Sequence, residues 1–158
     1  MCIRDSLTGL YNRRCFYQYI HNNRGGRTVS LMYIDLDRFK EVNDTYGHKV
    51  GDAVLVHTAD VLRRLFRDDF VARLGGDEFL VVRLGKCSMD QMEQEAEAFL
   101  KEMRTAFLAA EQTVSLSASV GIAQSSDSMV DIDALLQRSD QALYQAKKAG
   151  RSRYCVYR

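Results

Sequence analysis

The sequence predicts an α+β fold in which helices flank a mixed or antiparallel central sheet. Stretches with the 3.6-residue period of an amphipathic helix alternate with short apolar stretches typical of strands. One segment, residues 70–84, has the pattern of an antiparallel hairpin. With 158 residues, of which 46% are hydrophobic and 27% charged, the chain is long enough for one domain with its own core.

The first part of the chain predicts three helices around one central strand. Apolar residues recur at helical spacing within residues 12–23, and the nearly continuous apolar run 29–35 is typical of a strand buried on both faces. A short helix is expected over residues 38–46. A longer helix over residues 51–66 carries an apolar stripe that ends with Phe66, so we expect Phe66 to pack inward.

The second part adds the elements that complete the sheet and cover it. The periodicity predicts a long helix over residues 88–110 and a strand over residues 114–123. A further helix over residues 131–149 precedes Gly150, which suits a helix C-terminus. A closing strand is expected over residues 154–157.

Composition excludes several classes of partner and site. The net charge of +1 provides no broad basic field, so we expect neither nucleic acid nor membrane contact by this domain. No apolar run approaches the 18 residues of a membrane span, and no signal peptide is evident, so we expect a cytoplasmic location. The cysteines are far apart, which favours reduced thiols over a zinc site or disulfides. His21 and His57 are expected at the surface.

The segment 73–79 (RLGGDEF) is the most informative feature of the chain. Gly75 and Gly76 force a tight turn of the primed type, and Asp77 and Glu78 follow at its tip. Acids in this position can hold a metal ion, and bare glycines let a flat ligand approach the backbone. The alternative is a hairpin whose polar tip only faces water.

A second acidic cluster follows the central strand. Asp35 and Asp37 can share a face because side chains alternate along a strand. Together with Asp77 and Glu78 they suggest a carboxylate cage for Mg²⁺ or Mn²⁺. The alternative role is to cap the next helix. We favour the metal for Asp35 and the cap for Asp37.

Two further pairs of polar residues suit a nucleotide. Asn43 and Asp52 can hydrogen-bond the edge of guanine, although both could also be caps. Lys147 and Arg151 project from one face if the last helix continues through Gly150. They could hold phosphates, or they could only complement the helix dipole.

These motifs together resemble a GGDEF domain, the catalytic module of diguanylate cyclases, over essentially the whole chain. The matching stretches are LTGLYNRR (7–14), DLDRFKEVNDTYGHKVGD (35–52), RLGGDEF (73–79), SVGIA (119–123) and ALYQAKKAGR (142–151). The resemblance implies a sheet related to the nucleotidyl cyclase and polymerase-palm architecture. It also implies Mg²⁺- or Mn²⁺-dependent condensation of two GTP into cyclic di-GMP and pyrophosphate by a homodimer.

The resemblance assigns roles by position. The residues implied to hold the metal are Asp35, Asp77 and the carbonyl of Leu36, with Glu78 near the reacting 3′-hydroxyl. The residues implied to bind GTP are Asn43 and Asp52 at guanine, Lys40, Lys147 and Arg151 at the triphosphate, and Gly75 and Gly76 along the nucleotide. One departure is that Phe66 replaces the arginine of the family's inhibitory site for product, although Asp69 is retained. We therefore expect feedback inhibition to be weak.

The resemblance leaves a second hypothesis for the function open. It is a catalytically silent GGDEF domain that binds GTP or cyclic di-GMP as a regulator.

We expect residues 1–158 to form one GGDEF domain, and we expect a sensory region upstream, which could anchor the protein in a membrane. Residues 1–6 (MCIRDS) resemble a translated sequencing-adapter read-through, so Asp5 is given little weight.

Overall fold

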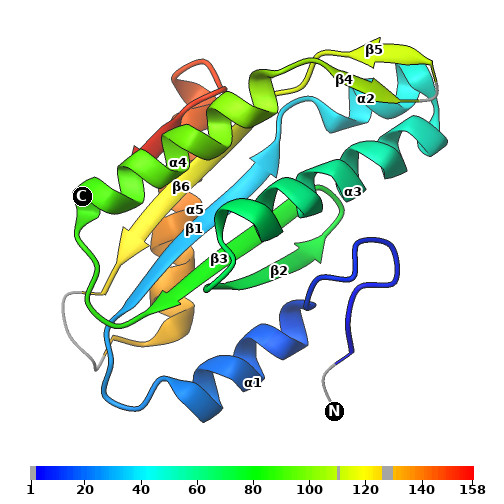
Figure 1. The fold of residues 1–158 in the computed structure, drawn as a ribbon. Coiled ribbons are helices and arrows are strands. Elements are labelled where there is room, and N and C mark those ends of the chain that lie inside the picture. The colour runs from blue at the N-terminus through cyan, green and yellow to red at the C-terminus, as the bar shows by residue number, and fades with distance from the viewer. Residues whose placement is uncertain (1–2, 110, 126–129) are drawn as a thin grey trace.

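The computed structural model describes residues 3–109, 111–125 and 130–158, and Figure 1 shows their fold. The helices are α1 (Arg13–Asn23), α2 (Phe39–Tyr46), α3 (His48–Leu65), α4 (Met89–Arg104) and α5 (Ile132–Lys148). The strands are β1 (Val29–Leu36), β2 (Phe70–Gly75), β3 (Glu78–Leu84), β4 (Phe107–Ala109), β5 (Gln112–Val114), β6 (Ala118–Gln124) and β7 (Tyr154–Val156).

The central sheet has the strand order β2-β3-β1-β6-β7, so the predicted mixed sheet is confirmed. Its pairs are antiparallel except for β6 and β7, which run parallel. All eight residues of β1 are buried, as the continuous apolar run predicted. The short strands β4 and β5 form a separate antiparallel hairpin.

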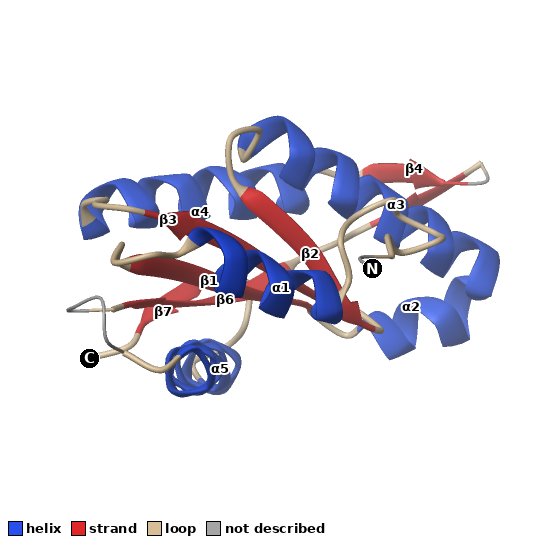
Figure 2. Cartoon of the chain, turned by 90° about the horizontal axis from the view of Figure 1, so that it is seen from below, coloured by secondary structure: helices blue, strands red, loops and turns tan. Residues whose placement is uncertain are grey.

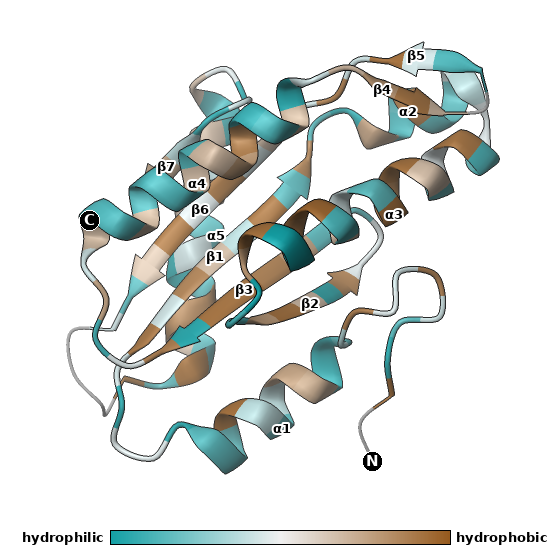
Figure 3. Cartoon of the chain, in the orientation of Figure 1, coloured by the Kyte–Doolittle hydropathy of each residue, from teal (hydrophilic) through white to brown (hydrophobic). Residues whose placement is uncertain are grey.

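Helices cover both faces of this sheet. Figure 2 shows α3 and α4 above the sheet and α5 below it. Alternate residues of β1 face the two layers: Met32 and Ile34 pack in the core under α3 and α4, whereas Leu31 and Tyr33 pack in the core that includes α1 and α5. This alternation places Asp35 on the α5 face at the end of the strand. Figure 3 shows the brown apolar residues concentrated along the sheet and the inner helix surfaces.

Three predicted boundaries are wrong. The helix expected over residues 88–110 ends at Arg104, because Thr105 adopts an extended conformation and Phe107 begins β4. The strand expected over residues 114–123 is divided between β5 and β6. The helix expected from residue 51 begins at His48. Within the described residues no helix combines the length and the apolar character that a membrane span needs.

Two side-chain environments also differ from expectation. His57 is half-buried rather than on the surface, and its ring stacks on Phe107 with a centroid distance of 4.2 Å. Cys15 is disulfide-bonded, whereas Cys87 and Cys155 are free thiols as expected. Spacing along the sequence gave no indication of this bond. Cys2 lies outside the described residues.

Candidate active site

The signature forms the predicted hairpin between β2 and β3, but its turn lies one residue later than the expected Gly75-Gly76 turn. Gly75 pairs with Glu78, which leaves Gly76 and Asp77 as the two turn residues. The φ angle of Gly76 is 50° and that of Gly75 is 147°, both in the range that favours glycine. A Cβ atom built on either glycine would meet nothing within 4 Å. The backbone of the tip is therefore open to a ligand.

The tip meets the end of the central strand. Glu78 pairs directly with Asp35 across the sheet, and the Leu36 N–H donates to the Asp77 carbonyl at 3.2 Å. The Asp35 and Asp77 side chains are close enough to interact with each other. The structure therefore brings together the two acids that the sequence suggested as metal ligands, from segments about 40 residues apart in the chain.

The charge balance at Asp35 suits a cation. Its Oδ1 atom is buried and has no hydrogen-bond partner among the residues that the structure describes, and its Oδ2 accepts from the Lys147 ammonium. Burial raises the pKa of Asp35 to about 6; Lys147 opposes this shift, and the neighbouring Asp77 carboxylate adds to it. A divalent cation would satisfy the orphaned oxygen and relieve the repulsion between the two carboxylates.

The donor set is small, so a metal here would need other ligands as well. Among the described residues no group of three His, Cys, Asp or Glu side chains is arranged to hold a metal ion. Asp35, Asp77 and a backbone carbonyl such as that of Leu36 would leave positions for water or substrate phosphate. That arrangement is typical of Mg²⁺, which keeps several such ligands.

Lys147 and Arg151 do not share a helical face. Helix α5 ends at Lys148, and the Gly150 and Arg151 N–H groups donate back to Lys147 and Ala146 at 3.2 and 3.0 Å. This pattern is a Schellman motif with Gly150 at its left-handed position, as the sequence suggested. Arg151 follows the helix with a φ of 65° and lines a pocket beside α2, whereas Lys147 contacts Asp35.

Asp37 does not cap the next helix. The residue before α2 is Arg38, in a left-handed conformation and without a side-chain capping bond. The Asp37 carboxylate instead accepts hydrogen bonds from Ser117, Ser119 and Ser152. The predicted cap is wrong because partners distant in the sequence, which the local pattern does not reveal, use both carboxylate oxygens.

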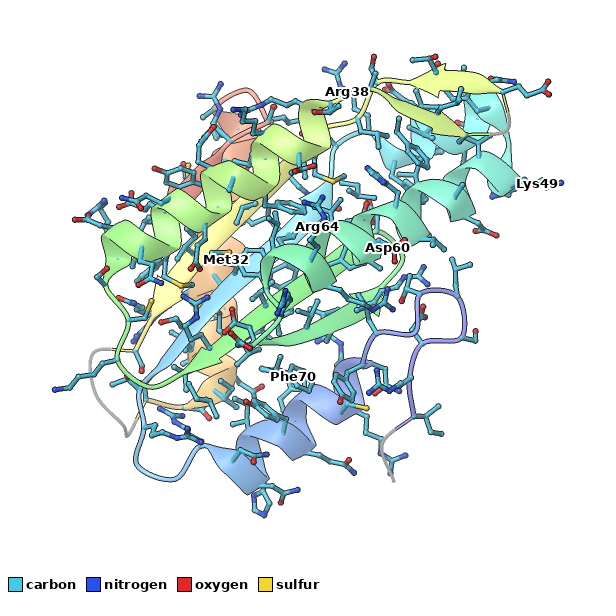
Figure 4. All side chains as sticks on the ribbon, viewed as in Figure 1. Met32, Arg38, Lys49, Asp60, Arg64 and Phe70 are labelled. Carbon is cyan, nitrogen blue, oxygen red and sulfur yellow. The ribbon has the colours of Figure 1, made fainter. Side chains whose placement is uncertain are left out.

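The residues suggested to recognise guanine lie on α2 and α3. Asn43 packs so closely on Gly51 that a Cβ there would lie 1.8 Å from the Asn43 Oδ1 atom. Lys40 and Asp52 are exposed. Because Asp37 and Arg38 alone separate β1 from α2, α2 and the beginning of α3 lie at the end of the sheet that carries Asp35 (Figures 1 and 4).

Sequence reasoning missed Tyr33 as a partner of this site. The buried Tyr33 hydroxyl donates to the Glu78 carboxylate. Burial and then the Glu78 charge raise the pKa of Tyr33. Tyr33 lies two residues before Asp35 on the same strand face, so strand alternation could have identified it.

The second missed pair is Asp5 and Arg73. The Arg73 guanidinium donates to the Gly76 carbonyl at 2.9 and 2.7 Å and to Asp5 at 3.0 Å, which holds the hairpin tip. Burial acts upward on the pKa of Asp5, but hydrogen bonds from Thr8 and the charge of Arg73 lower it below its ordinary value. Asp5 thus has a structural role, although it received little weight because residues 1–6 resemble a sequencing-adapter read-through.

In the region expected to correspond to the inhibitory site, Phe66 is buried and Asp69 is paired within the domain. Phe66 is 2% exposed and belongs to the core, as predicted. The retained Asp69 accepts two hydrogen bonds from Arg83, at 2.9 and 2.6 Å, and Arg83 also pairs with Glu95. Arg64, labelled in Figure 4, pairs with Glu102 of α4 at 3.2 Å.

Comparisons with known proteins agree on one family. The family model described as "Diguanylate cyclase, GGDEF domain" matches residues 2–153. The chain is 40% identical over 157 residues to the cyclic di-GMP phosphodiesterase PdeR of Escherichia coli (strain K12), covering 97% of this chain and 24% of PdeR. It is 38% identical over 162 residues to the probable diguanylate cyclase DgcC of the same organism, covering 97% of this chain and 43% of DgcC.

A solved structure agrees with the fold. The crystal structure of the GGDEF domain of DgcB from Caulobacter crescentus in complex with c-di-GMP superposes with a TM-score of 0.89 at 29% identity, over 98% of this chain and 95% of that one. The palm-like α+β fold is therefore confirmed. The chain spans about a quarter of PdeR and less than half of DgcC. By its sequence and its fold, the chain belongs to the GGDEF domain family of diguanylate cyclases.

Proposed function

We propose that this domain is a diguanylate cyclase that condenses two GTP molecules into cyclic di-GMP and pyrophosphate, with Mg²⁺ or Mn²⁺, between two copies of the domain. The observation that supports this proposal most is the proximity of the Asp35 and Asp77 side chains, where the buried Oδ1 of Asp35 has no hydrogen-bond partner within the described part of the chain. Phosphoryl transfer needs positioning and charge neutralisation more than covalent help from the protein.

The proposed reaction assigns work to each group at the strand end. The 3′-hydroxyl of one GTP attacks the α-phosphorus of the other, a phosphodiester forms and pyrophosphate leaves; a second such step closes the ring. Asp35, Asp77 and the Leu36 carbonyl would hold Mg²⁺, which would neutralise phosphate charge. Glu78, oriented by Tyr33, would accept the proton of the 3′-hydroxyl.

The remaining residues would bind and orient the nucleotide. Asn43 and Asp52 would hydrogen-bond guanine, and Lys40, Lys147 and Arg151 would bind the triphosphate. The open backbone at Gly75 and Gly76 would let the nucleotide lie against the hairpin. Each domain would position one GTP, so two domains must meet face to face, most simply with two-fold symmetry.

A second candidate function follows from one of the relatives. PdeR is named a phosphodiesterase although it contains a segment 40% identical to this chain. A domain of this family can therefore belong to a protein that is not named a cyclase. In this alternative the domain binds GTP or cyclic di-GMP as a regulator and makes no product.

The test is incubation of the purified chain with GTP and Mg²⁺, with identification of the product by chromatography and mass spectrometry. We expect cyclic di-GMP from the wild type and none from Asp35→Asn or Asp77→Asn, since an amide keeps the shape but loses the charge that binds Mg²⁺. Asp90→Asn, at an exposed position in the first turn of α4, is the matched control. If the folded wild type binds GTP and yields no product, the regulatory alternative holds.

A further inference from the structure

Asp37 connects three segments that are far apart in the chain. Its carboxylate accepts hydrogen bonds from the Ser117 hydroxyl at 2.6 Å, the Ser119 hydroxyl at 2.7 Å and the Ser152 backbone N–H at 3.0 Å. Its own N–H donates to the Ser117 carbonyl at 2.9 Å. Both carboxylate oxygens are therefore engaged within the protein, so Asp37 is not arranged as a metal ligand.

The segment that Asp37 contacts after α5 has an unfavourable backbone. The φ angles of Gly150, Arg151 and Ser152 are 125°, 65° and 51°. Only glycine adopts such values without strain, so Arg151 and Ser152 need contacts that hold them there. The start of the turn is held by α5, through the bond from the Arg151 N–H to Ala146.

The end of this turn is held by charged side chains. Asp37 accepts from the Ser152 N–H, and Arg104 at the end of α4 donates to the Ser152 hydroxyl and carbonyl at 2.9 and 2.6 Å. Of these anchors, Asp37 alone comes from the segment between β1 and α2. It therefore links the candidate metal-binding end of β1 to the turn that carries Arg151.

Arg151 is available to an anion. It is exposed and lines a pocket of about 390 Å³ together with Asp37, Arg38 and Ser152. Among the residues that the structure describes, its guanidinium has no hydrogen-bond or ion-pair partner. Lys147 is already paired with Asp35. Of Lys147 and Arg151, Arg151 is thus the residue whose charged group is unpaired among the described residues.

We propose that Asp37 is a positioning residue that fixes the turn 150–152 and so aims Arg151 at the β- and γ-phosphates of the nucleotide. This inference rests on the proposed function for the class of ligand, a guanosine triphosphate. It assigns to Asp37 neither metal binding nor helix capping. A guanidinium binds phosphate strongly only when its fork is correctly oriented, so loosening its backbone weakens the contact.

The test measures binding rather than turnover. The probe is 3′-deoxy-GTP, which keeps the triphosphate and lacks the attacking hydroxyl, and the comparison ligand is GMP; both are titrated calorimetrically with Mg²⁺ present. We expect Asp37→Asn and Arg151→Ala each to weaken binding of 3′-deoxy-GTP at least about tenfold, the value of one charge-assisted contact. Binding of GMP should change less than about twofold.

A double-mutant cycle separates positioning from a general structural effect. If Asp37 acts through Arg151, the variant Asp37→Asn/Arg151→Ala binds 3′-deoxy-GTP no more weakly than Arg151→Ala alone. Additive losses, equal losses for GMP, or an unchanged affinity in Asp37→Asn would each overturn the proposal. Asp133→Asn is the control, because Asp133 also accepts a hydroxyl hydrogen bond, 2.8 Å from Tyr17.

A second variant covers the case in which Asp37→Asn does not fold. The double variant Ser117→Ala/Ser119→Ala removes the two hydroxyl donors and keeps the carboxylate. It should lower affinity for 3′-deoxy-GTP several-fold without changing affinity for GMP, and an unchanged affinity for both would count against the proposal. A wild type that binds 3′-deoxy-GTP but makes no cyclic di-GMP would refute the proposed function and leave the positioning role to be decided by these titrations.

Discussion

At the scale of single residues, Gly51 determines the position of an amide that is suggested to read guanine. A Cβ at this position would lie 1.8 Å from Asn43 Oδ1 and 2.9 Å from its Cγ. The obstructing atoms belong to the end of a flexible side chain, so Asn43 can rotate away. A larger residue here would therefore disturb the proposed site more than the fold.

We predict that Gly51→Ala keeps or raises the melting temperature and weakens GTP binding. Alanine in a helix is more favourable than glycine by about 0.5–1 kcal/mol. Loss of one net hydrogen bond from Asn43 should raise the KM for GTP roughly two- to tenfold. Thermal unfolding and initial rates check this, with Asn43→Ala as the comparison. An unchanged KM in a stable Gly51→Ala protein would remove Asn43 from guanine recognition.

Base selectivity should depend on Asp52. A carboxylate accepts hydrogen bonds from the N1–H and N2–H groups of guanine and repels the acceptor N1 of adenine. We predict a preference for GTP over ATP of at least about a hundredfold, which collapses in Asp52→Ala. Competition of the two nucleotides in an initial-rate assay is the measurement, and Asp44→Ala, an exposed acid of α2, is the control. Equal use of ATP by the wild type would show that the guanine assignment is incorrect.

Inhibition by cyclic di-GMP should be weak because the Asp69 carboxylate is already hydrogen-bonded within the domain. Arg83 engages both oxygens of Asp69, and Phe66 supplies no guanidinium. One missing charge-assisted hydrogen bond costs about 1.5–3 kcal/mol of binding free energy. The affinity for cyclic di-GMP should therefore be at least about tenfold lower than in a domain that has this arginine. An initial-rate titration with cyclic di-GMP tests this expectation. Submicromolar inhibition would mean that another arginine has replaced the missing one.

The variant Phe66→Arg is a poor way to restore inhibition. Phe66 is 2% exposed within the core, so an arginine there would bury a charge and remove an apolar side chain. Phe66→Arg should unfold at lower temperature than the wild type whatever its effect on inhibition. The wild-type titration is therefore the decisive measurement.

At the scale of elements, the contact between α5 and β6 depends on Gly121. A Cβ there would lie 2.1 Å from the Ser139 carbonyl oxygen and 2.3 Å from the Leu143 nitrogen, both backbone atoms of α5. We predict that Gly121→Ala lowers the free energy of unfolding by about 3 kcal/mol or more, because the helix must move outward. Denaturant unfolding measures this, with Gly26→Ala as the control, since a Cβ on Gly26 would meet nothing within 4 Å. If Gly121→Ala lowers the free energy of unfolding by less than about 1 kcal/mol, α5 can move away from β6 at little cost.

The contact between α3 and the β4–β5 hairpin should make stability depend on pH. Burial lowers the pKa of His57; Asp60 and Glu102 oppose this shift, and Arg64 adds to it. The unfolded chain therefore takes up a proton at His57 more readily than the folded one. The contribution of neutral His57 to the free energy of unfolding is therefore complete above the ordinary histidine pKa of about 6.5. This contribution is lost as the pH falls below that value.

Replacing His57 should remove this part of the pH dependence. His57→Phe keeps a ring against Phe107 and cannot titrate, so the fall in melting temperature from pH 7 to pH 5 should be smaller than in the wild type. His21→Gln, at an exposed position of α1, is the control. Identical slopes in His57→Phe and the wild type would show that His57 does not contribute.

At the scale of the whole molecule, the proposed reaction requires two domains. If each domain positions one GTP, the rate should rise as roughly the second power of protein concentration when the protein is dilute. Fusion to a dimeric coiled coil should increase the rate by raising the effective concentration. Assays from nanomolar to tens of micromolar protein, with sedimentation, check this. A linear dependence with no dimer would contradict catalysis between two copies.

The sequence by itself determined the kinds of elements and the local parts of the candidate site. Helical periodicity, the buried strand and the Gly-Gly turn are short-range patterns, so α1, β1, the β2–β3 hairpin and α5 were predicted close to their observed bounds. The Asp35 and Asp77 positions followed from the same patterns, because Asp35 lies at the end of the central strand and Asp77 lies in the hairpin turn. The inward position of Phe66 followed from its place in the apolar stripe.

Only the tertiary structure decided which groups meet. Asp37 accepts hydrogen bonds from residues 80 or more positions away, and Arg83 of β3 donates to Asp69, which immediately precedes β2. The left-handed turn at Arg151 and the pairing of Phe107 in β4 also depend on contacts beyond the local sequence. The physical reason is that periodicity reports which face of an element is buried, whereas hydrogen-bond and ion-pair partners depend on how complete elements pack.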